Sequence, residues 1–236
     1  MDHAGYTTLS RQRGLAREMQ IVANNIANSA TTGFRAEGLI FSEFVKAVDN
    51  GASLSMGQGN IRNTSFAQGT LTQTGGTFDL AIEGDGFFLI ETPDGERLTR
   101  SGAFSPSAEG DLVTVDGLRV LDAGGAPLFV PPGASIAVAA DGTVSADGDP
   151  IGQIGVVRPL DPHDMVRETG VMFRTDAGFE PSESARVVQG FIENSNVNAV
   201  LEITRMIAVQ RAYELGQSFL ESEDERVRAA LRSIMT

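Results

Sequence analysis

The stretch NAVLEITRMIAVQRAYELGQSFLESEDERVRAALRSIMT, residues 198–236, decides the fold of this chain. It contains no proline and a single glycine, Gly216. An apolar residue recurs at every seventh position, at Met206, Tyr213, Leu220, Val227 and Ile234. This period is typical of a long amphipathic helix, here about 55 Å long at roughly 1.5 Å per residue. Asn198 is the expected N-cap, and Glu202 stands in the first turn, where the helix dipole favours a negative charge.

A second row of residues lies three positions before each member of the first. It consists of Ile203, Gln210, Gln217, Asp224 and Leu231, and it is apolar only at its ends. Polar residues buried in such a seam can fix helix register at a cost in stability, while simple exposure of that row is the alternative. A helix of this length needs a partner from the same chain or from another copy. An ordinary core helix of a globular protein fits the same periodicity.

The other end of the chain also has helical periodicity, over residues 5–28. Its apolar residues Leu15, Met19, Val22 and Ile26 are spaced by four, three and four. A neighbouring row contains Ala16, Ala23 and Ala27, whose small side chains let another helix approach closely. The helix is expected to end at Ser29-Ala30-Thr31-Thr32-Gly33, where poor helix formers follow one another. The chain therefore begins and ends in long amphipathic helices.

The segment between the helices divides into two parts. Residues 34–77 are read as an extended connector rich in Gly, Ser, Thr and Asn. Its first part, 34–50, is a short helical or extended piece. The rest, 50–77, is irregular, with strand potential at 59–66 and 69–74, and a disordered linker is the alternative for it. Residues 78–190 show short apolar runs separated by Asp-Gly and other turn signals, which predicts an all-β domain of roughly eight to ten strands. The predicted fold class is α+β. Segments 1–33 and 191–236 pair as a coiled-coil-like helical core around a mainly antiparallel β middle domain.

The charge distribution limits the classes of partner that the chain is expected to bind. The net charge of −13 comes almost entirely from residues 76–190, which carry seven Arg and nineteen acidic residues. An acidic surface of this kind is poorly suited to nucleic acid or to anionic lipid. No stretch is long and apolar enough for a membrane span, so no membrane insertion is expected. The first residues lack the features of a secretory signal, which predicts a cytoplasmic protein or one exported by another route.

Chemistry-bearing motifs are scarce. With no cysteine, a thiolate nucleophile and Cys-ligated metal are excluded. His163 lies between Asp161 and Asp164 and could serve a metal or a proton relay, but a solvated turn explains the cluster better. The motifs of common hydrolases, nucleotide-binding loops and dinucleotide folds do not occur. We therefore predict no catalytic, cofactor-binding or metal-binding residue and no enzymatic activity. A soluble enzyme or binding module with a cleft in its β domain is the remote alternative.

Motifs at both ends of the chain resemble those of the flagellar axial proteins, the rod and hook subunits. The N-terminal motif includes Asn24, Asn25, Asn28, Gly33 and Phe34, within Ala23–Asn28 and Thr31–Arg35. The C-terminal motif includes Ser195, Asn196, Val197, Asn198, Gln210 and Arg211, within Glu193–Asn198 and Met206–Glu214. The segments 71–75 and 80–88 are also similar to that family. Two specific motifs in the right order make chance a poor explanation.

The resemblance implies a structural subunit of the bacterial flagellar basal-body rod, most like the proximal rod branch; a distal rod or hook relative is the alternative. It implies export through the flagellar type III apparatus without a cleaved signal, and a periplasmic position in the rod. The implied partners are copies of the chain itself and other rod proteins, which polymerise helically through their terminal helices. The residues expected at the assembly interface are Leu15, Met19, Val22, Ile26, Met206, Tyr213, Leu220 and Val227.

Overall fold

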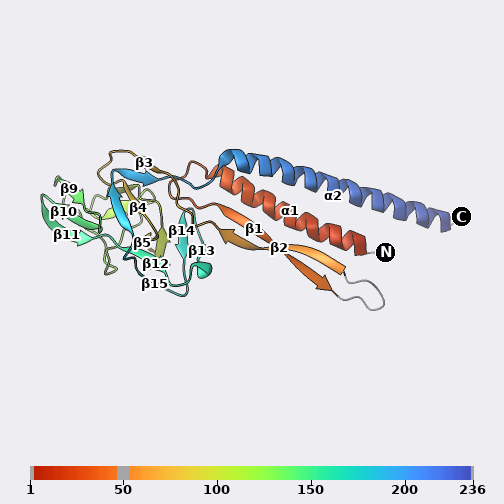
Figure 1. Cartoon of the computed structure of the whole chain (residues 1–236), viewed down its shortest axis with the longest axis horizontal. Helices are drawn as coiled ribbons and strands as arrows, with labels where there is room; N and C mark the ends of the chain where they lie inside the picture. Colours follow the sequence, from red (N-terminus) through yellow and green to blue (C-terminus); the bar gives the residue numbers. More distant parts are fainter. Residues whose placement is uncertain (1–2, 47–53, 235–236) are drawn as a thin grey trace. The chain divides into compact units, whose positions relative to one another are not determined.

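The computed structural model describes residues 3–46 and 54–234 (Figure 1). Its contacts divide the chain into two compact units. The helical unit comprises Met1–Ser29, Ala36–Phe66 and Val197–Thr236, and the β unit comprises Ala30–Arg35 and Ala67–Asn196. Long helices at both ends and antiparallel strands between them confirm the predicted combination of secondary structure.

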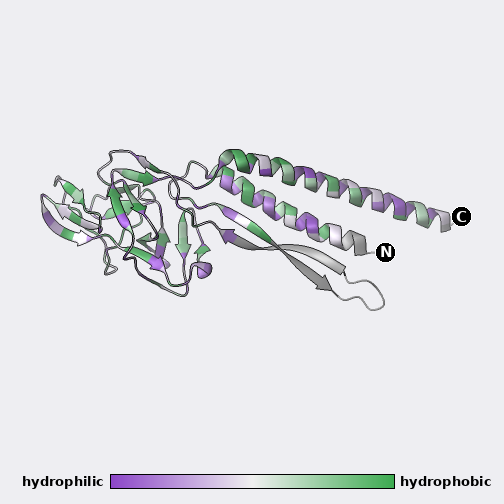
Figure 2. Cartoon of the chain, viewed as in Figure 1, coloured by the Kyte–Doolittle hydropathy of each residue, from purple (hydrophilic) through white to green (hydrophobic). Residues whose placement is uncertain are grey.

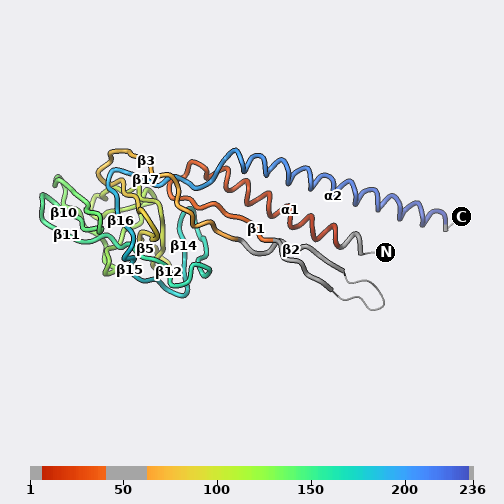
Figure 3. Tube along the Cα trace, viewed as in Figure 1, coloured from red at the N-terminus to blue at the C-terminus, as the bar shows by residue number. Residues whose placement is uncertain are grey.

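Two helices form most of the helical unit. Helix α1 (His3–Ala27) and helix α2 (Ala199–Ile234) lie side by side, as the Cα trace in Figure 3 shows. They run in opposite directions, because Asn25 near the end of α1 contacts Glu202 near the start of α2. Hydrophobic and hydrophilic residues alternate along both helices (Figure 2). The amphipathic pattern read from the sequence therefore produces two helices that pair within one chain.

The limits of the helices follow from their flanking residues. Asn198 caps α2, since its side-chain Oδ1 accepts hydrogen bonds from the backbone N–H groups of Val200 and Leu201 at 3.1 and 3.2 Å. Helix α1 ends at Ala27, one residue before the predicted limit. The N–H of Asn28 still bonds to the carbonyl of Asn24, after which the backbone turns away. Both predicted helix ends are thus explained by local hydrogen bonds.

A β-hairpin completes the helical unit where the sequence suggested an extended connector. Strand β1 (Glu37–Lys46) pairs antiparallel with β2 (Leu54–Thr64), with a bulge between Ile40 and Phe41. The hairpin packs against α1. The predicted connector 34–77 includes residues 47–53, which lie outside the described residues. The structure places most of the remaining connector in this regular hairpin. The strand potential read at 59–66 lies partly within β2, and that read at 69–74 includes β3 (Leu71–Gln73).

The β unit is built from short antiparallel strands in several small sheets. Its largest sheet has six strands in the order β13-β14-β6-β5-β12-β15. These strands are β13 (Val166–Arg167), β14 (Met172–Arg174), β6 (Gly95–Thr99), β5 (Phe87–Thr92), β12 (Val156–Pro159) and β15 (Phe179–Pro181). A three-stranded sheet joins β11 (Asp149–Gln153), β10 (Thr143–Ala146) and β9 (Ile136–Val138). The remaining pairs are β16 (Arg186–Gln189) with β4 (Leu80–Glu83), β17 (Phe191–Glu193) with β3 (Leu71–Gln73), and β7 (Phe104–Pro106) with β8 (Leu112–Thr114).

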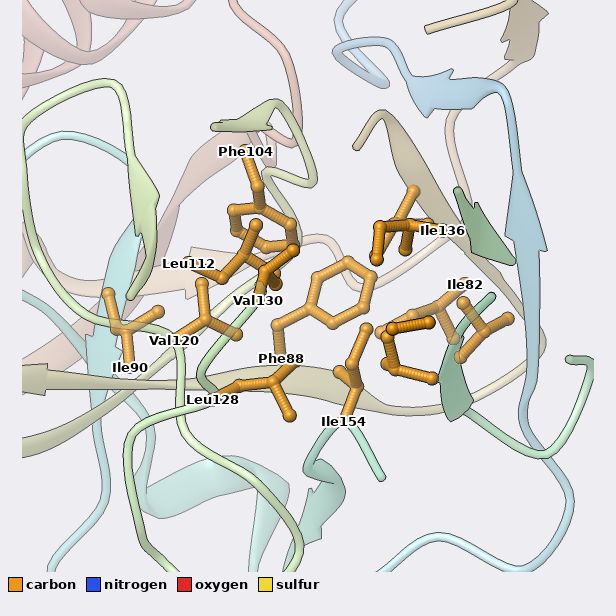
Figure 4. Packing of buried hydrophobic residues seen from close by; sticks show 14 residues of the cluster. Ile82, Phe88, Ile90, Phe104, Leu112, Val120, Leu128, Val130, Ile136 and Ile154 are labelled. Atoms are coloured by element: carbon orange, nitrogen blue, oxygen red, sulfur yellow. The ribbon is translucent and has the colours of Figure 1, made fainter. Parts of the chain in front are cut away.

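The core of the β unit gathers around Phe88, which is fully buried. Figure 4 shows its ring between Phe104 and Ile154, with Ile82 and Ile136 nearby. The ring of Phe104 meets that of Phe88 edge to face, with 5.2 Å between ring centroids. The apolar residues that the sequence places on alternate positions of short runs therefore fill one continuous core.

Turn chemistry in the β unit follows the Asp-Gly pattern. Asp147 and Gly148 join β10 to β11, and both have positive φ, at 53° and 96°. That conformation suits a two-residue hairpin loop and explains the residue types found there. The segment around His163 forms a short 3₁₀ helix, η1 (Pro162–Asp164), in which the His163 side chain is exposed. The predicted solvated turn is the observed one.

Candidate assembly surface

Polar contacts connect α1 and α2 along their length. Gln12 Nε2 donates a hydrogen bond to the backbone carbonyl of Tyr213 at 2.8 Å. Arg205 lies 2.8 Å from Glu18 in an ion pair. Asn25 Nδ2 donates to a carboxylate oxygen of Glu202 at 3.2 Å. Together with apolar packing, these contacts fix the register between the two helices.

The eight residues predicted for the assembly interface lie mostly at this seam. On α1, Leu15 and Val22 are buried, while Met19 and Ile26 are half-buried. On α2, Met206, Tyr213 and Leu220 are half-buried and Val227 is 47% exposed. The structure thus uses most of this set within one chain. Their contact with other copies stays a prediction.

The second predicted row of α2 faces solvent. Gln210, Gln217 and Asp224 are all exposed, as are Ile203 and Leu231 at the ends of the row. Val209 is buried and Gly216 is half-buried, and both lie next to the first row on the side opposite the second row. The seam of α2 is therefore formed by Met206, Tyr213 and Leu220 together with these two residues. The sequence left open whether the polar row is buried or exposed, and the structure shows that it is exposed.

Gly216 is explained by the side chain of Gln12. A Cβ at position 216 would lie 1.9 Å from Gln12 Nε2. The missing side chain lets Gln12 reach across the seam to the carbonyl of Tyr213. A groove of about 410 Å³ lies beside this point, between the two helices, with Leu15, Leu215 and Phe219 in its lining. The only glycine of α2 thus marks a close approach between the helices.

The side of α2 away from the seam exposes large apolar residues. Val200 is 73% exposed, Ile203 49% and Ile207 47%. On another side of α2, beside the groove, Leu215 and Phe219 are 73% and 43% exposed. Single exposed apolar residues are common on soluble proteins, whereas a row of them along one helix indicates an interaction surface. This row is the strongest candidate for contact with another molecule in the helical unit.

The asparagine motif has a structural role in the helical unit. Asn25 is fully buried, and its side-chain amide pairs with the backbone of Glu37 in both directions. Nδ2 donates to the Glu37 carbonyl at 2.8 Å, and Oδ1 accepts from the Glu37 N–H at 3.0 Å. This side chain acts as an extra strand partner at the start of β1. Asn24 is exposed, and Asn28 bonds through Nδ2 to the Asn24 carbonyl at 2.9 Å.

Two residues of the C-terminal motif, Gln210 and Arg211, stand exposed on α2. Gln210 Nε2 donates to Glu214 one turn later at 3.1 Å. Neither side chain has a role in the seam. A role of the two residues in contacts with other molecules stays a prediction.

A buried cluster of charges joins the two motifs within the β unit. Arg35 Nη1 lies 2.6 Å from Glu193 Oε1, and both side chains have no exposed surface. The other carboxylate oxygen accepts a bond from Arg100 Nη1 at 3.2 Å. The N–H of Gly69 also donates to Glu193 Oε1, at 2.7 Å. One carboxylate therefore binds two arginines and a backbone amide.

Burial shifts the pKa of one arginine of this cluster, Arg100. It lowers the pKa of Arg100 to about 10, and the neighbouring Glu193 opposes that shift. A buried ion pair contributes little net stability by itself, but removal of one partner leaves an uncompensated charge. Glu193 is thus the residue on which the cluster depends.

The other motif residues of the β unit surround this cluster. The N–H of Gly33 donates to the Glu193 carbonyl at 2.7 Å, and the N–H of Asn196 donates to the Phe34 carbonyl at 3.3 Å. Gly33 has φ of +70°, and a Cβ there would lie 2.3 Å from the backbone nitrogen of Ser101, so only glycine fits. Phe34 is buried under the guanidinium of Arg167, 4.3 Å from its ring centroid. Ser195 of the β unit is half-buried, as is Val197, the first residue of the last part of the helical unit.

The described part of the chain contains neither a group of three or more His, Asp or Glu side chains placed to hold a metal ion nor a helix with the length and hydropathy of a membrane span.

Comparison with known proteins matches three parts of the chain to flagellar families. Residues 6–35 match the flagella basal body rod protein family, and residues 81–146 match the flagellar hook protein FlgE/F/G D1 domain. Residues 188–233 match the C-terminal family of the flagellar basal body rod FlgEFG proteins. The first match ends at Arg35, and the last includes Glu193. The buried ion pair therefore links the two terminal family segments.

Full-length relatives give the same assignment. The flagellar basal-body rod protein FlgF of Caulobacter vibrioides is 41% identical over 99% of this chain and 98% of its own length. FlgF of Escherichia coli is 32% identical over 95% of both chains, and FlgG of Bacillus subtilis is 31% identical over 93% of this chain and 94% of its own length.

The helical unit, the β unit and the two linked terminal motifs are those of a flagellar axial protein. The chain belongs to the family of flagellar basal-body rod proteins. Its 41% identical relative from Caulobacter vibrioides bears the name FlgF. This is a family of structural proteins, which confirms that the chain is not an enzyme.

Several important residues were absent from the predicted set. Val209 and Gly216 could have been found by testing both possible rows beside the apolar heptad. Arg35 and Glu193 lie within the two terminal motifs. Their opposite charges were the only sign in the sequence that they could form a pair. Arg100 lies in an ordinary strand context and carried no signal. Its role depends on the tertiary fold alone.

Proposed function

We propose that this chain is a structural subunit of the proximal part of the flagellar rod, which polymerises helically through its helical unit. The observation that carries this proposal is the exposed apolar row of α2, with Val200 73% exposed in a segment that matches the rod family. In a rod, a neighbouring subunit would cover that row. The β unit, with its acidic surface, would remain at the periphery.

Within each subunit, α1 and α2 form a coiled-coil-like pair. The seam on α2 alternates steps of three and four residues through Met206, Val209, Tyr213, Gly216 and Leu220. Such alternation keeps one stripe facing the partner helix. The eight predicted interface residues then act mainly by forming this two-helix element. The surfaces that contact other copies lie on its outer sides.

The proposed partners are further copies of this chain, other rod proteins and the flagellar export apparatus. The proposed location is the periplasmic rod, reached by export without cleavage of a signal. The names of the relatives support a basal-body position.

Complementation with an epitope-tagged chain tests the proposal. Basal bodies purified from the complemented strain should contain the tagged chain, and deletion of the gene should abolish swimming and filament assembly. Val200→Asp together with Ile207→Asp should prevent incorporation, because each subunit would bury two carboxylates. Gln217→Asp, at an exposed polar position of the second row, is the control and should incorporate. Absence of the tagged wild-type chain from motile cells' basal bodies would contradict the proposal.

A distal rod or hook position is the second candidate. FlgG of Agrobacterium fabrum is 32% identical over 88% of this chain, compared with 41% over 99% for FlgF of Caulobacter vibrioides. The greater identity and coverage favour the proximal position. Partial disassembly of purified basal bodies distinguishes the two, because a distal subunit would leave with the hook.

A further inference from the structure

The exposed apolar row at the start of α2 forms a ridge on one face of that helix. The ridge consists of Val200, Ile203 and Ile207, and steps of three and four residues keep these exposed side chains on one face. Val209, which is buried in the seam with α1, lies on a nearly opposite face of α2. The ridge therefore points away from the partner helix of its own chain.

The groove between α1 and α2 is an apolar recess with a matching pattern. Its volume is about 410 Å³. Leu15 of α1 lines one wall, and the other wall includes Ala212, Leu215 and Phe219 of α2. Steps of three and four residues separate these residues of α2, as in the ridge. The ridge and the groove wall therefore have the same length, about 10 Å along a helix.

The ridge and the groove cannot meet within one chain. At about 3.6 residues per turn, the groove wall of α2 lies roughly 120° around the helix from the ridge. Ile203 and Leu215, the central residues of the two sets, are also twelve residues apart, or about 18 Å along the axis. A contact between them requires a second copy. Such a contact joins two different surfaces, so it can repeat from copy to copy and build an open assembly.

One register between two parallel α2 helices brings every ridge residue beside one residue of the groove wall. This register is a shift of twelve residues, or about 18 Å. The resulting pairs are Val200 with Ala212, Ile203 with Leu215, and Ile207 with Phe219. Each pair joins two apolar side chains, so the contact removes apolar surface from water on both copies.

The same register also matches charges. Seven residues beyond Ile207, the face of the ridge carries the exposed Glu214. Seven residues beyond Phe219, the face of the groove wall carries the exposed Arg226, so the shift of twelve residues sets the two opposite each other. Arg226 also pairs with Glu223 of its own chain at 2.6 Å, and a guanidinium has enough donors for a second carboxylate. One register therefore joins apolar with apolar and acidic with basic residues.

An antiparallel arrangement of the same two surfaces lacks this charge match. It would place Val200 beside Phe219, and Glu214 would then be level with Arg205. The side chain of Arg205 is held by Glu18 in the seam with α1, at 2.8 Å. The charges therefore favour the parallel arrangement.

We propose that the ridge of α2 packs, in parallel orientation, into the groove between α1 and α2 of a second copy that is shifted by about 18 Å along the helix axis. The inference rests on the proposed function, because it names the surface that covers the exposed row in the rod. Glu214 of the first copy pairs with Arg226 of the second. A single contact of this size is weak, and its repetition along the assembly stabilises the whole.

A disulfide cross-link tests the register, because the chain contains no cysteine. In a chain with Ile207→Cys and Phe219→Cys, the two positions lie about 18 Å apart on one helix. They cannot bond within the chain, because a disulfide needs Cα atoms within about 7 Å of each other. Oxidation of the concentrated purified chain should therefore join separate chains into a ladder of dimers and longer products.

Val200→Cys with Phe219→Cys is the matched control for the cross-link. Val200 lies about 10 Å from Ile207 along the ridge, so this chain should cross-link far less. An antiparallel contact would instead favour the control. Cross-linking of the control to the same or a greater extent would overturn the register.

Charge exchange tests the pair of Glu214 and Arg226. Glu214→Arg or Arg226→Glu should each lower the amount of tagged chain in purified basal bodies at least about threefold, because like charges then face each other. The chain with both substitutions has the wild-type net charge and should recover to near the wild-type amount, since the pair is restored in reverse. This recovery is specific, because a change at Glu214 cannot repair the lost pair between Arg226 and Glu223.

Asp224→Arg and Arg228→Glu are the matched controls for charge. They change the charge of α2 by the same amounts and break another ion pair within the helix, at 2.8 Å, but lie outside the ridge and the groove. Each should incorporate normally, and circular dichroism verifies that the helices form in every variant. Normal incorporation of Glu214→Arg and Arg226→Glu would contradict the contact. So would a folded double variant that incorporates no better than the single ones.

The outcomes separate this contact from the proposed function. If the purified chain cross-links as expected but the tagged wild-type chain is absent from basal bodies, the contact stands and the rod assignment fails. If the wild-type chain is present and either the cross-link or the charge exchange fails, the rod assignment stands and only the contact is wrong.

Discussion

Arg35 and Glu193 form an ion pair of 2.6 Å in which neither side chain has exposed surface. They are separated by most of the chain, and each belongs to a different terminal family segment. The pair brings the end of the first segment to the start of the last one. Each of these segments therefore depends on the other to compensate a buried charge.

Substitution of Glu193 should destabilise the β unit strongly. Glu193→Gln would leave Arg35 and Arg100 as two buried charges without a carboxylate, and loss of one partner of a buried pair costs about 3–5 kcal/mol. Chemical denaturation of the purified chain, followed by a probe in the β unit, gives the free energy of unfolding. Glu180→Gln breaks the exposed pair with Arg158 and is the control, with an expected cost of about 0–1 kcal/mol. Equal effects of the two variants would refute the special role of Glu193.

The ion pairs of Glu168 should make stability depend on acid pH. Hydrogen bonding from Arg97, with the nearby charges of Arg97 and Arg174, lowers the pKa of Glu168. A carboxylate with a lowered folded-state pKa stabilises the protein above its unfolded pKa, and that contribution is lost as pH falls through the folded value. The difference in unfolding free energy between the wild type and Glu168→Gln should therefore be largest near neutral pH and shrink below about pH 4.5. A difference that stays constant from pH 7 to pH 3 would contradict this coupling.

Asn25 should be essential for the attachment of β1 to α1. Asn25→Ala leaves the N–H and carbonyl of Glu37 without their side-chain partner, and each buried group left unsatisfied costs about 1–3 kcal/mol. Hydrogen exchange should show lost protection at the Glu37 amide. Asn24→Ala changes an exposed side chain and should cost about 0.5 kcal/mol or less. Retained protection in Asn25→Ala would exclude this role.

Gly216 and Gln12 should be energetically coupled. Gly216→Ala gains about 1 kcal/mol of helix propensity but displaces Gln12 from the Tyr213 carbonyl, so the two effects should nearly cancel. In a Gln12→Ala background the obstacle is gone, and Gly216→Ala should stabilise the helical unit. Thermal unfolding of the four chains in this double-mutant cycle gives the coupling. Stabilisation by the same amount in both backgrounds would show that the contact is unimportant.

The sequence predicted the elements of the helical unit better than their contacts. Periodicity located both helices, because a long apolar stripe at a spacing of three and four residues is typical of a helix and of no other regular element. It did not identify the second half of the α2 seam, since Gly216 contributes by the absence of a side chain. Simple hydrophobicity prefers Ile203 and Leu231, which are exposed. Apolar residues that are exposed on a helix are indistinguishable from buried ones in a single sequence.

The connector and the charge cluster were less predictable for a different reason. Strand β2 (Leu54–Thr64) is rich in polar residues and glycine, so the sequence indicated a strand over only part of it, at 59–66, and its pairing with β1 was not predicted. Arg35, Arg100 and Glu193 lie far apart in the sequence and come together only in the folded chain. The family motifs showed that Arg35 and Glu193 belong to important segments. Only the fold shows that they touch.

The places where the chain passes between the two units have a consequence for how such proteins can vary. The carbonyl of Ala67 accepts bonds from Arg35 Nη1 and from Asn196 Nδ2, each at 2.8 Å. Residues 67–196 therefore leave and return to the same point, as an inserted module does. A replacement module of another size needs only to bring its own ends together there. A chain in which a short turn replaces residues 70–192 should keep the helical signal of α1 and α2 in circular dichroism, and loss of that signal would show that the module is not interchangeable.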